Sequence, residues 1–167
     1  LVRWSFKLMR HYAVEGNKEM LSDRYGFKYN PGFLANGDFA DGLNGWTVSP
    51  AAEGSVGAHT IAGYGKNSQG RWGGGSAGDT VCVMTRNADK PNRISQTANG
   101  LEVGRVYCLQ FVTADLKDVT DKKYNPRRYG IRAELQGAEI LRDKSFVHID
   151  RRNSGRYKHN NNVAKIN

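Results

Sequence analysis

The stretch LANGDFADGLNGW, residues 34–46, carries more structural information than any other part of the chain. Two large apolar residues, Phe39 and Trp46, flank a loop that contains two glycines. Gly42 and Gly45 can adopt backbone angles closed to other residues, so they permit the sharp reversal that brings both aromatic rings into one core. The stretch predicts a short strand, a tight turn and a second strand that Trp46 opens; a hairpin of some other β protein is the alternative.

The chain after residue 34 continues in the same manner. Turn signals such as those at residues 99–100 and 136–137 separate short β-forming runs, and residues 105–113 alternate with a period of two. This pattern favours an all-β fold, an antiparallel β-sandwich or jelly roll, and it lacks the strand–helix–strand units of a parallel sheet. The predicted strands are Gly45–Val48, Ser55–Ile61, Gly78–Thr85, Asn92–Ala98, Arg105–Ala114, Gly130–Leu135, Ala138–Leu141 and Phe146–Asp150.

Residues 1 to about 25 have a different, helical pattern. Trp4, Leu8 and Tyr12 recur at helical spacing and predict a helix to about residue 14, with a further turn from Asn17 to Leu21. A helix this apolar needs a partner surface. We therefore interpret residues 1–33 as a helical segment and linker that ends an upstream domain, and residues 34–167 as a β-sandwich module.

A second motif, ISQTANGLEVGRVY at residues 94–107, adds specificity. With residues 34–46 it resembles the galactose-binding-like jelly roll found in many carbohydrate-binding modules. In that family a strand ends in Ser-Gln, a Gly-Leu-x-x-Gly turn follows, and the next strand begins with a Tyr. The resemblance implies that the turn at Val103 and Gly104 lets Leu101 enter the core while Tyr107 starts a strand.

The resemblance also implies a function. Such modules are non-catalytic, bind carbohydrate, and accompany the catalytic domain of a secreted or periplasmic polysaccharide-degrading enzyme such as a glycoside hydrolase. They commonly hold a structural calcium near the first strand, where Asp38 and Asp41 lie here. The rival reading is a structural β-sandwich spacer that docks on the catalytic domain and binds no sugar.

The end of the chain departs from the family pattern. These modules close with a strand that contains paired acids and lies beside the first strand. Residues 160–167, NNNVAKIN, contain no such segment. We expect that the chain stops before this strand or that the strand was lost, which would leave a sheet edge exposed.

The net charge of +9 is unevenly distributed, since residues 114–167 hold 13 basic and seven acidic side chains. A basic surface attracts nucleic acid, anionic lipid or anionic polysaccharide without specificity. The basic residues are mixed with acids, which favours a solvated sheet face and makes a nucleic-acid partner the third choice. The sequence contains no apolar run of transmembrane length, so we expect no membrane partner.

Cys82 and Cys108 are the only cysteines, and each lies in a predicted strand. Their spacing excludes a Cys-x-x-Cys motif, and no nearby His supports a zinc site. A disulfide between neighbouring strands and two buried free thiols both remain open.

The sequence contains no positive sign of an active site. Glu134 and Glu139 flank a turn and could face each other, but exposed hairpin acids are commoner than catalytic pairs. The four histidines show neither metal spacing nor an adjacent nucleophile. A lyase-like set of Tyr129, Arg132 and His148 is a weaker alternative, and we predict a non-enzymatic segment.

Sugar binding requires a flat aromatic side chain surrounded by planar polar groups. Two loops meet this requirement, a glycine-rich one at residues 64–75 and a polar one at residues 122–129. The predicted contact residues are Tyr64, Arg71, Trp72, Tyr124, Arg127 and Tyr129. The alternative is that Trp72 packs under its own loop and that Tyr124 is an ordinary surface residue.

The positive charge of the C-terminal third indicates which class of glycan the module would bind. Arginine makes forked contacts with carboxylate or sulfate groups. If the arginines lie on the same face as the tyrosines of the polar loop, an anionic glycan such as a uronate or a sulfated galactan should be preferred. The arginines concerned are Arg127, Arg128, Arg151, Arg152 and Arg156.

Overall fold

In the computed structural model of this chain, the residues described are 13–16, 33–65, 78–126, 130–153 and 156–167. The chain divides into two compact units, Leu1–Gly32 and Phe33–Asn167. The helix predicted for residues 1–25 lies almost entirely outside the described residues, and an upstream domain stays a prediction.

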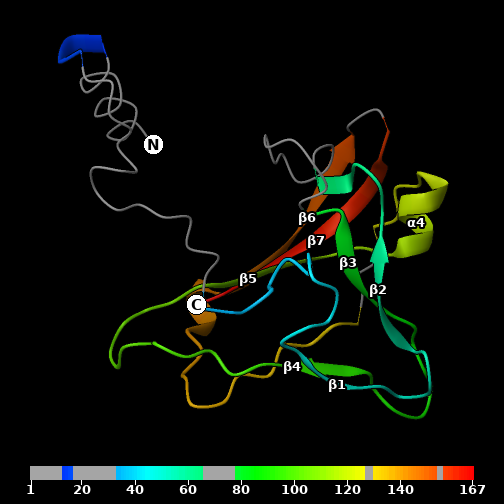
Figure 1. The fold of residues 1–167 in the computed structure, drawn as a ribbon, viewed down its shortest axis with the longest axis horizontal. Coiled ribbons are helices and arrows are strands. Elements are labelled where there is room, and N and C mark those ends of the chain that lie inside the picture. The colour runs from blue at the N-terminus through cyan, green and yellow to red at the C-terminus, as the bar shows by residue number, and fades with distance from the viewer. Residues whose placement is uncertain (1–12, 17–32, 66–77, 127–129, 154–155) are drawn as a thin grey trace. The chain divides into compact units, whose positions relative to one another are not determined.

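The second unit is built mainly from short antiparallel strands (Figure 1). All the pairings among its described strands are antiparallel, and helix makes a small contribution. The elements are β1 Thr47–Ser49, β2 Val56–Thr60, β3 Thr80–Met84, β4 Arg93–Ser95, β5 Leu109–Thr113, α4 Leu116–Asp121, the 3-10 helix η2 Arg142–Lys144, β6 Phe146–Asn153 and β7 Lys158–Ile166. The all-β character predicted from the sequence is confirmed, whereas the sandwich and jelly-roll arrangement stays a prediction.

The strands form three small sheets. β1 pairs with β4, with Val48 opposite Ile94, and β2 pairs with β3, with Ala58 opposite Cys82. The third sheet has the order β5-β7-β6 and is the largest. β5 and β6, the outer strands of this sheet, are therefore both hydrogen-bonded to β7, the last strand of the chain.

The predicted strands end at residue 150, and the structure adds one more, β7, at the end of the chain. β7 pairs with β5 and β6 and not with β1, so the expected loss of the closing strand beside the first strand stays a prediction. β7 spans nine residues, Lys158–Ile166, and residues 159–164 are buried. Sequence reasoning missed it because His159–Asn162 is a run of polar residues with no period-two alternation. β6 pairs with the whole of this run, whereas β5 reaches only its last residue, Asn162. The pairing with β6 satisfies backbone groups of the run, which compensates for the weak β-propensity of asparagine.

Two other predicted strands, at residues 130–135 and 138–141, are also wrong. Both segments are irregular and largely exposed. In the first, Arg132 and Glu134 form an ion pair, and Glu134 also pairs with Arg93 at 3.1 Å. Side chains at i and i+2 point the same way along an extended chain, so local charge pairing explains the conformation without a partner strand.

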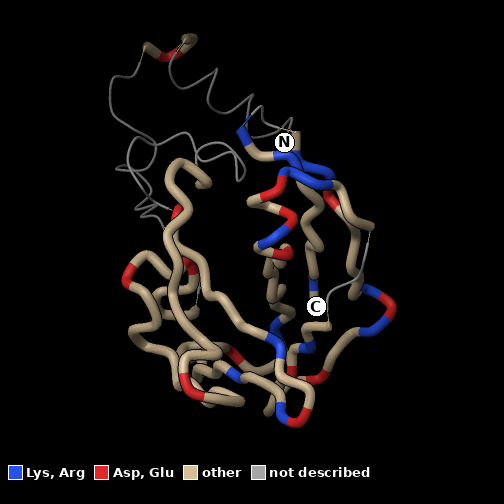
Figure 2. Tube along the Cα trace, turned by 90° about the vertical axis from the view of Figure 1, so that its right-hand side faces the viewer, with Lys and Arg blue, Asp and Glu red and all other residues tan. Residues whose placement is uncertain are grey.

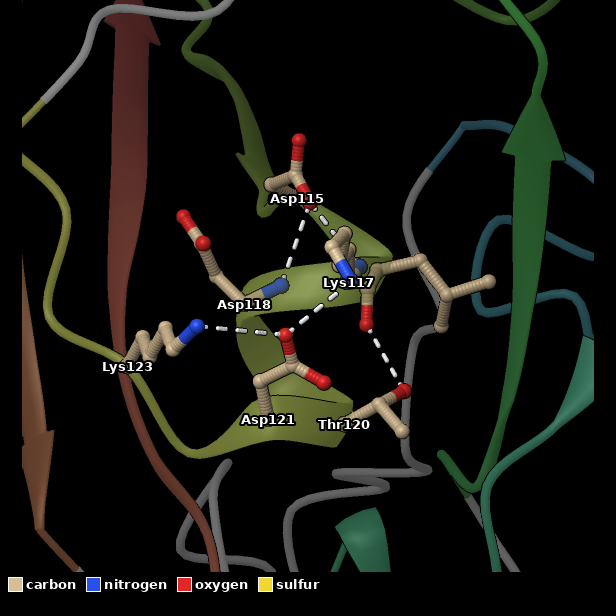
Figure 3. Close-up of polar contacts among 7 residues, drawn as sticks. Asp115, Lys117, Asp118, Thr120, Asp121 and Lys123 are labelled. Atoms are coloured by element: carbon tan, nitrogen blue, oxygen red, sulfur yellow. Dashed lines mark hydrogen bonds and ion pairs between the residues drawn. The ribbon is translucent and has the colours of Figure 1, made fainter.

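The sequence did not predict the helix α4, whose contacts Figure 3 shows. Asp115 is its N-cap: one carboxylate oxygen accepts from the backbone N–H groups of Lys117 at 2.8 Å and Asp118 at 3.1 Å. Asp121 forms ion pairs with Lys117 at 3.2 Å and with Lys123 at 3.6 Å. An N-cap of this kind satisfies backbone donors that have no partner inside the helix.

The buried apolar core is small. Among the described residues, Tyr64, Val119 and Tyr157 form its main cluster, with Ile61 and Ala114 packed against them. These residues come from the turn after β2, from α4 and from the residue before β7, so the core lies where α4 covers one end of β7 (Figure 1).

Candidate functional site

The loop at residues 34–46 is organised around Asn36. Its side-chain NH2 donates to the carbonyl oxygens of Gly42 at 3.1 Å and Asn44 at 2.9 Å, and its Oδ1 accepts from the N–H of Asp41 at 3.0 Å. The indole N–H of Trp46 donates to the carbonyl oxygen of Asn36 at 3.1 Å. One amide side chain therefore ties both sides of the loop together.

The aromatic pair predicted for this loop is confirmed. The ring centroids of Phe39 and Trp46 lie 5.4 Å apart, and both side chains are partly buried. Gly42 and Gly45 have φ values of 57° and 81°, as the tight reversal requires. The short strand predicted before the turn is wrong, because residues 34–38 form turns, and β1 begins at Thr47 directly after the Trp.

Gln96 joins the two motifs that carry the family resemblance. Its side-chain NH2 donates to the carbonyl oxygens of Ala35 at 2.9 Å and Gly45 at 2.7 Å. Its Oε1 accepts from the N–H of Ala35 at 2.6 Å. The side chain thus holds the two ends of the 34–46 loop against the end of β4, across 51 and 61 positions of sequence.

The second motif is only partly as predicted. Gly104 has a φ of 82°, which confirms the turn, but Leu101 is 45 % exposed and does not enter the core. Tyr107 precedes β5 instead of starting it; its hydroxyl accepts from the N–H of Glu102 at 2.8 Å. The phenol closes the turn, and its ring packs edge-on against Phe33 at 5.2 Å.

The two carboxylates predicted to hold calcium are engaged within the loop. Asp41 accepts from the side chain of Asn44 at 2.8 Å, and Asp38 accepts from the N–H of Ala40 at 3.4 Å. The nearby carbonyl oxygens of Gly42 and Asn44 accept from Asn36, so a cation would have to displace an NH2 group to reach them. The calcium site at Asp38 and Asp41 stays a prediction.

Tyr64, a predicted sugar contact, lies in the core. It is 5 % exposed, and its hydroxyl lies 3.0 Å from Nε2 of His159 and 3.4 Å from Oδ1 of Asn161. Its ring meets that of Tyr157 edge-on at 5.3 Å. Burial raises the pKa of the Tyr64 phenol. With no open face, this ring cannot stack on a sugar as placed here, and its role is to support the end of β7.

A turn built on Asp79 positions Tyr64. Asp79 is 5 % exposed, and its two carboxylate oxygens accept from the N–H groups of Gly63 and Gly65, each at 2.7 Å. Its carbonyl oxygen accepts from the N–H of Ile61 at 2.8 Å. No sequence signal marked this carboxylate beyond its place in a turn before β3.

His159 is the most buried polar residue of this cluster, with no exposed surface. Its Nε2 lies 3.0 Å from Oδ1 of Asn161, whereas its Nδ1 has no hydrogen-bond partner among the described residues. Burial is the main reason that the pKa of His159 is lowered, and Arg152 lowers it further. Arg152 is directly opposite in the sheet register and pairs with Asp150 at 2.7 Å.

Of the two predicted sugar contacts that lie within the described residues, Tyr124 is the partly exposed one. The guanidinium carbon of Arg151, on β6, lies 3.9 Å from the centroid of the Tyr124 ring. Tyr124 follows the left-handed C-cap of α4 at Lys122, which turns the chain toward β6. Arg156 lies 5.6 Å from the ring of Tyr157.

Several basic residues lie close to this pair in the sequence. Figure 2 shows Lys and Arg positions near one end of the described trace and others, interspersed with acidic positions, elsewhere along it. Lys122, Lys123, Arg151, Arg156 and Lys158 are all exposed. By contrast Arg152 is half-buried on the opposite face of the same sheet, because neighbouring residues of a strand point to opposite faces. The remaining predicted residues, Arg71, Trp72, Arg127, Arg128 and Tyr129, lie outside the described residues.

The acids considered for catalysis show no catalytic arrangement within the described ranges. Glu134 is paired with two arginines, and the neighbouring Arg132 is the largest cause of its lowered pKa. Glu139 is exposed. Of the lyase-like set, Tyr129 is outside the described residues, Arg132 pairs with Glu134, and His148 packs against Phe146 at 5.9 Å.

Cys82 and Cys108 are free thiols, which excludes the disulfide, but neither is fully buried as the other alternative expected. Burial raises the pKa of the Cys82 thiol, and Cys108 is exposed. In the part of the chain that is described, no three His, Cys, Asp or Glu residues are grouped so as to hold a metal ion. The helices described there are all too short or too polar to span a bilayer.

Comparison with protein-family models, curated proteins and solved structures found no match to this chain.

Proposed function

We propose that this chain is a non-catalytic carbohydrate-binding module that accompanies the catalytic domain of a secreted or periplasmic polysaccharide-degrading enzyme. The proposal includes the finer fold, a galactose-binding-like β-sandwich. Its sequence support is the pair of motifs at residues 34–46 and 94–107. Its structural support is that Gln96 brings these two motifs into contact through three hydrogen bonds.

The observation that carries the proposal is the contact between Arg151 and Tyr124 at 3.9 Å. The guanidinium lies over one face of the phenol ring, so a pyranose would stack on the other face while the guanidinium donates to hydroxyl or carboxylate groups. The arginine comes from β6 and the tyrosine from the loop after α4, so two separate elements form the surface. The surrounding lysines and arginines favour an anionic glycan.

The proposal is tested by affinity electrophoresis of the whole chain in gels that contain a polyuronate, a sulfated galactan or a neutral glucan. We expect the anionic polymers to retard the protein more than the neutral one. Tyr124→Ala and Arg151→Gln should each weaken retardation several-fold. Arg142→Gln is the matched control, because Arg142 is equally exposed but lies on η2.

Retardation that is unchanged by both substitutions would show that the site lies elsewhere. Retardation by none of the polymers would contradict carbohydrate binding.

A structural spacer that docks on a catalytic domain is the second candidate. The observation that favours it is the burial of Tyr64, since one of the aromatic rings expected to face a sugar supports the core instead. The same electrophoresis separates the two candidates, because a spacer is not retarded by any glycan.

A further inference from the structure

The outer edge of β6 is unpaired in the structure. The sheet order β5-β7-β6 leaves β6 with one neighbour, and its outer edge forms no hydrogen bond to any described residue. β6 is eight residues long, and Phe146, Val147 and Ile149 are 51 %, 55 % and 44 % exposed. Apolar side chains are therefore exposed on both faces of an open strand edge.

Natural sheets protect such edges with lysine, proline, bulges or very short strands. The half of β6 from Phe146 to Ile149 has none of these devices, and its only ionisable residue is His148. The other half, Asp150–Asn153, carries an acid and two arginines. When two copies of such a strand pair in antiparallel orientation, the apolar half of each lies beside the charged half of the other.

We propose that β6 pairs with β6 of a second copy of this chain, antiparallel and centred on Ile149. For two copies to form one continuous sheet around a two-fold axis, residues on the same face must be opposite each other, so a single residue occupies the centre. Centres at His148, Asp150 or Arg151 would each set an ionisable residue against its own copy. Ile149 sets an apolar residue against itself.

The remaining pairs in this register are complementary. His148 lies opposite Asp150 of the second copy, and Phe146 lies opposite Arg152, a ring and a guanidinium that attract each other. Val147 lies opposite Arg151, whose aliphatic stem can cover it. The overlap spans residues 146–152, nearly the whole strand, whereas a centre at Val147 would leave only residues 146–148 overlapping.

The opposite edge of the sheet does not offer this complementarity. β5 has five residues, LQFVT, none of them charged. An antiparallel pair of β5 strands centred on Phe111 would therefore bring no opposite charges together. Of the two outer strands, β6 is therefore favoured for pairing with a second copy, both by its length and by its charges.

Cysteine crosslinking tests the register directly, in a Cys82→Ala, Cys108→Ser background of the whole chain. Ile149→Cys places two thiols opposite each other, with Cα atoms about 4.5–5.5 Å apart, which is within disulfide range. Val147→Cys places them four residues apart along the strands, about 13 Å. Under mild oxidation the first variant should form a covalent dimer and the second should not.

Sedimentation velocity over a concentration series tests the association itself. The unmodified chain should shift from one copy toward two as its concentration rises. Ile149→Lys should weaken this association about tenfold or more, because like charges then lie directly opposite each other. Val112→Lys is the matched control, since Val112 is 49 % exposed on β5, and it should leave the association unchanged.

A chain that stays monomeric up to its solubility limit overturns the proposal. Equal crosslinking of the two cysteine variants also overturns it, because the strands then pair in no fixed register. Neither result bears on the glycan proposal, since the contact between Tyr124 and Arg151 is present in a single copy.

Discussion

The phenol oxygen of Tyr64 lies 3.0 Å from Nε2 of His159, although 95 positions separate the two residues in the sequence. The turn after β2 and the start of β7 therefore meet inside the protein. The rings of Tyr64 and His159 are stacked, with centroids 5.7 Å apart. Since His159 has no exposed surface, this contact links the stability of the fold to the protonation state of a single imidazole.

Stability should fall as the solution becomes acidic. The pKa of His159 is lowered in the folded protein, chiefly by burial, so the unfolded chain binds a proton that the folded chain does not. This contribution is fully present above the ordinary histidine pKa of about 6.5, and it is lost as pH falls below that value. The loss is at most about 1.4 kcal/mol per pH unit. Urea unfolding at pH 8, 7, 6 and 5 measures it.

His159→Asn should reduce this pH dependence. His148→Asn, at an exposed position on β6, is the control and should preserve it. A wild-type unfolding free energy that stays constant from pH 7 to pH 5 would contradict the assignment of a buried neutral imidazole.

Tyr64→Phe should destabilise the protein by about 1–3 kcal/mol, because it removes the hydroxyl that contacts His159 and Asn161 in a buried setting. Tyr107→Phe is the comparison, because its hydroxyl bonds one backbone N–H in an exposed turn. That change should cost less than about 1 kcal/mol. Chemical denaturation of both variants measures the two losses of unfolding free energy. Equal losses would show that the buried hydroxyl stabilises the protein no more than the exposed one.

Asn36→Ala should cost more than Asn36→Gly. Asn36 has a φ of 48°, in the left-handed region that alanine adopts poorly and glycine adopts freely. Both substitutions remove three side-chain hydrogen bonds, so the difference between them isolates backbone strain. We expect about 1 kcal/mol between the two unfolding free energies. Identical values would assign the whole effect to the hydrogen bonds.

Asp115→Ala should destabilise α4 and cost about 1 kcal/mol of unfolding free energy, since it removes the N-cap bonds to two backbone N–H groups (Figure 3). Asp115→Asn, which keeps an accepting oxygen, should recover most of this loss. Asp143→Ala on η2 is a control, because no side-chain cap exists there. If Asp115→Asn is as unstable as Asp115→Ala, the stabilisation by Asp115 comes from its negative charge and not from its hydrogen bonds.

Binding of an anionic glycan should weaken as salt concentration rises. Exposed charges are screened within about 8 Å at physiological ionic strength, whereas stacking of a ring on a sugar depends little on salt. Arg151→Gln should therefore reduce the salt dependence, and Tyr124→Ala should reduce affinity at every salt concentration. Titration calorimetry between about 50 and about 500 mM salt separates the charge contribution from the stacking contribution. A salt-independent affinity for the anionic polymer would rule out the charge component.

The sequence by itself determined the β-rich class, the place of the strands from β1 to β6, and the aromatic pair of Phe39 and Trp46. These features depend on local signals: glycines where φ is positive, β-forming runs and turns between them. Asp115 also stands at the start of α4 as an N-cap, a local signal that could have been used to find the helix.

The tertiary structure alone decided what becomes of the most polar segment. Residues 159–162 are buried in the strand β7, where β6 pairs with all four of them and β5 reaches only Asn162. It also decided that Tyr64 supports the core while Tyr124 contacts Arg151 at the surface. The physical reason is that burial and hydrogen bonding depend on which distant segments meet, and a local pattern of residue types does not contain that information.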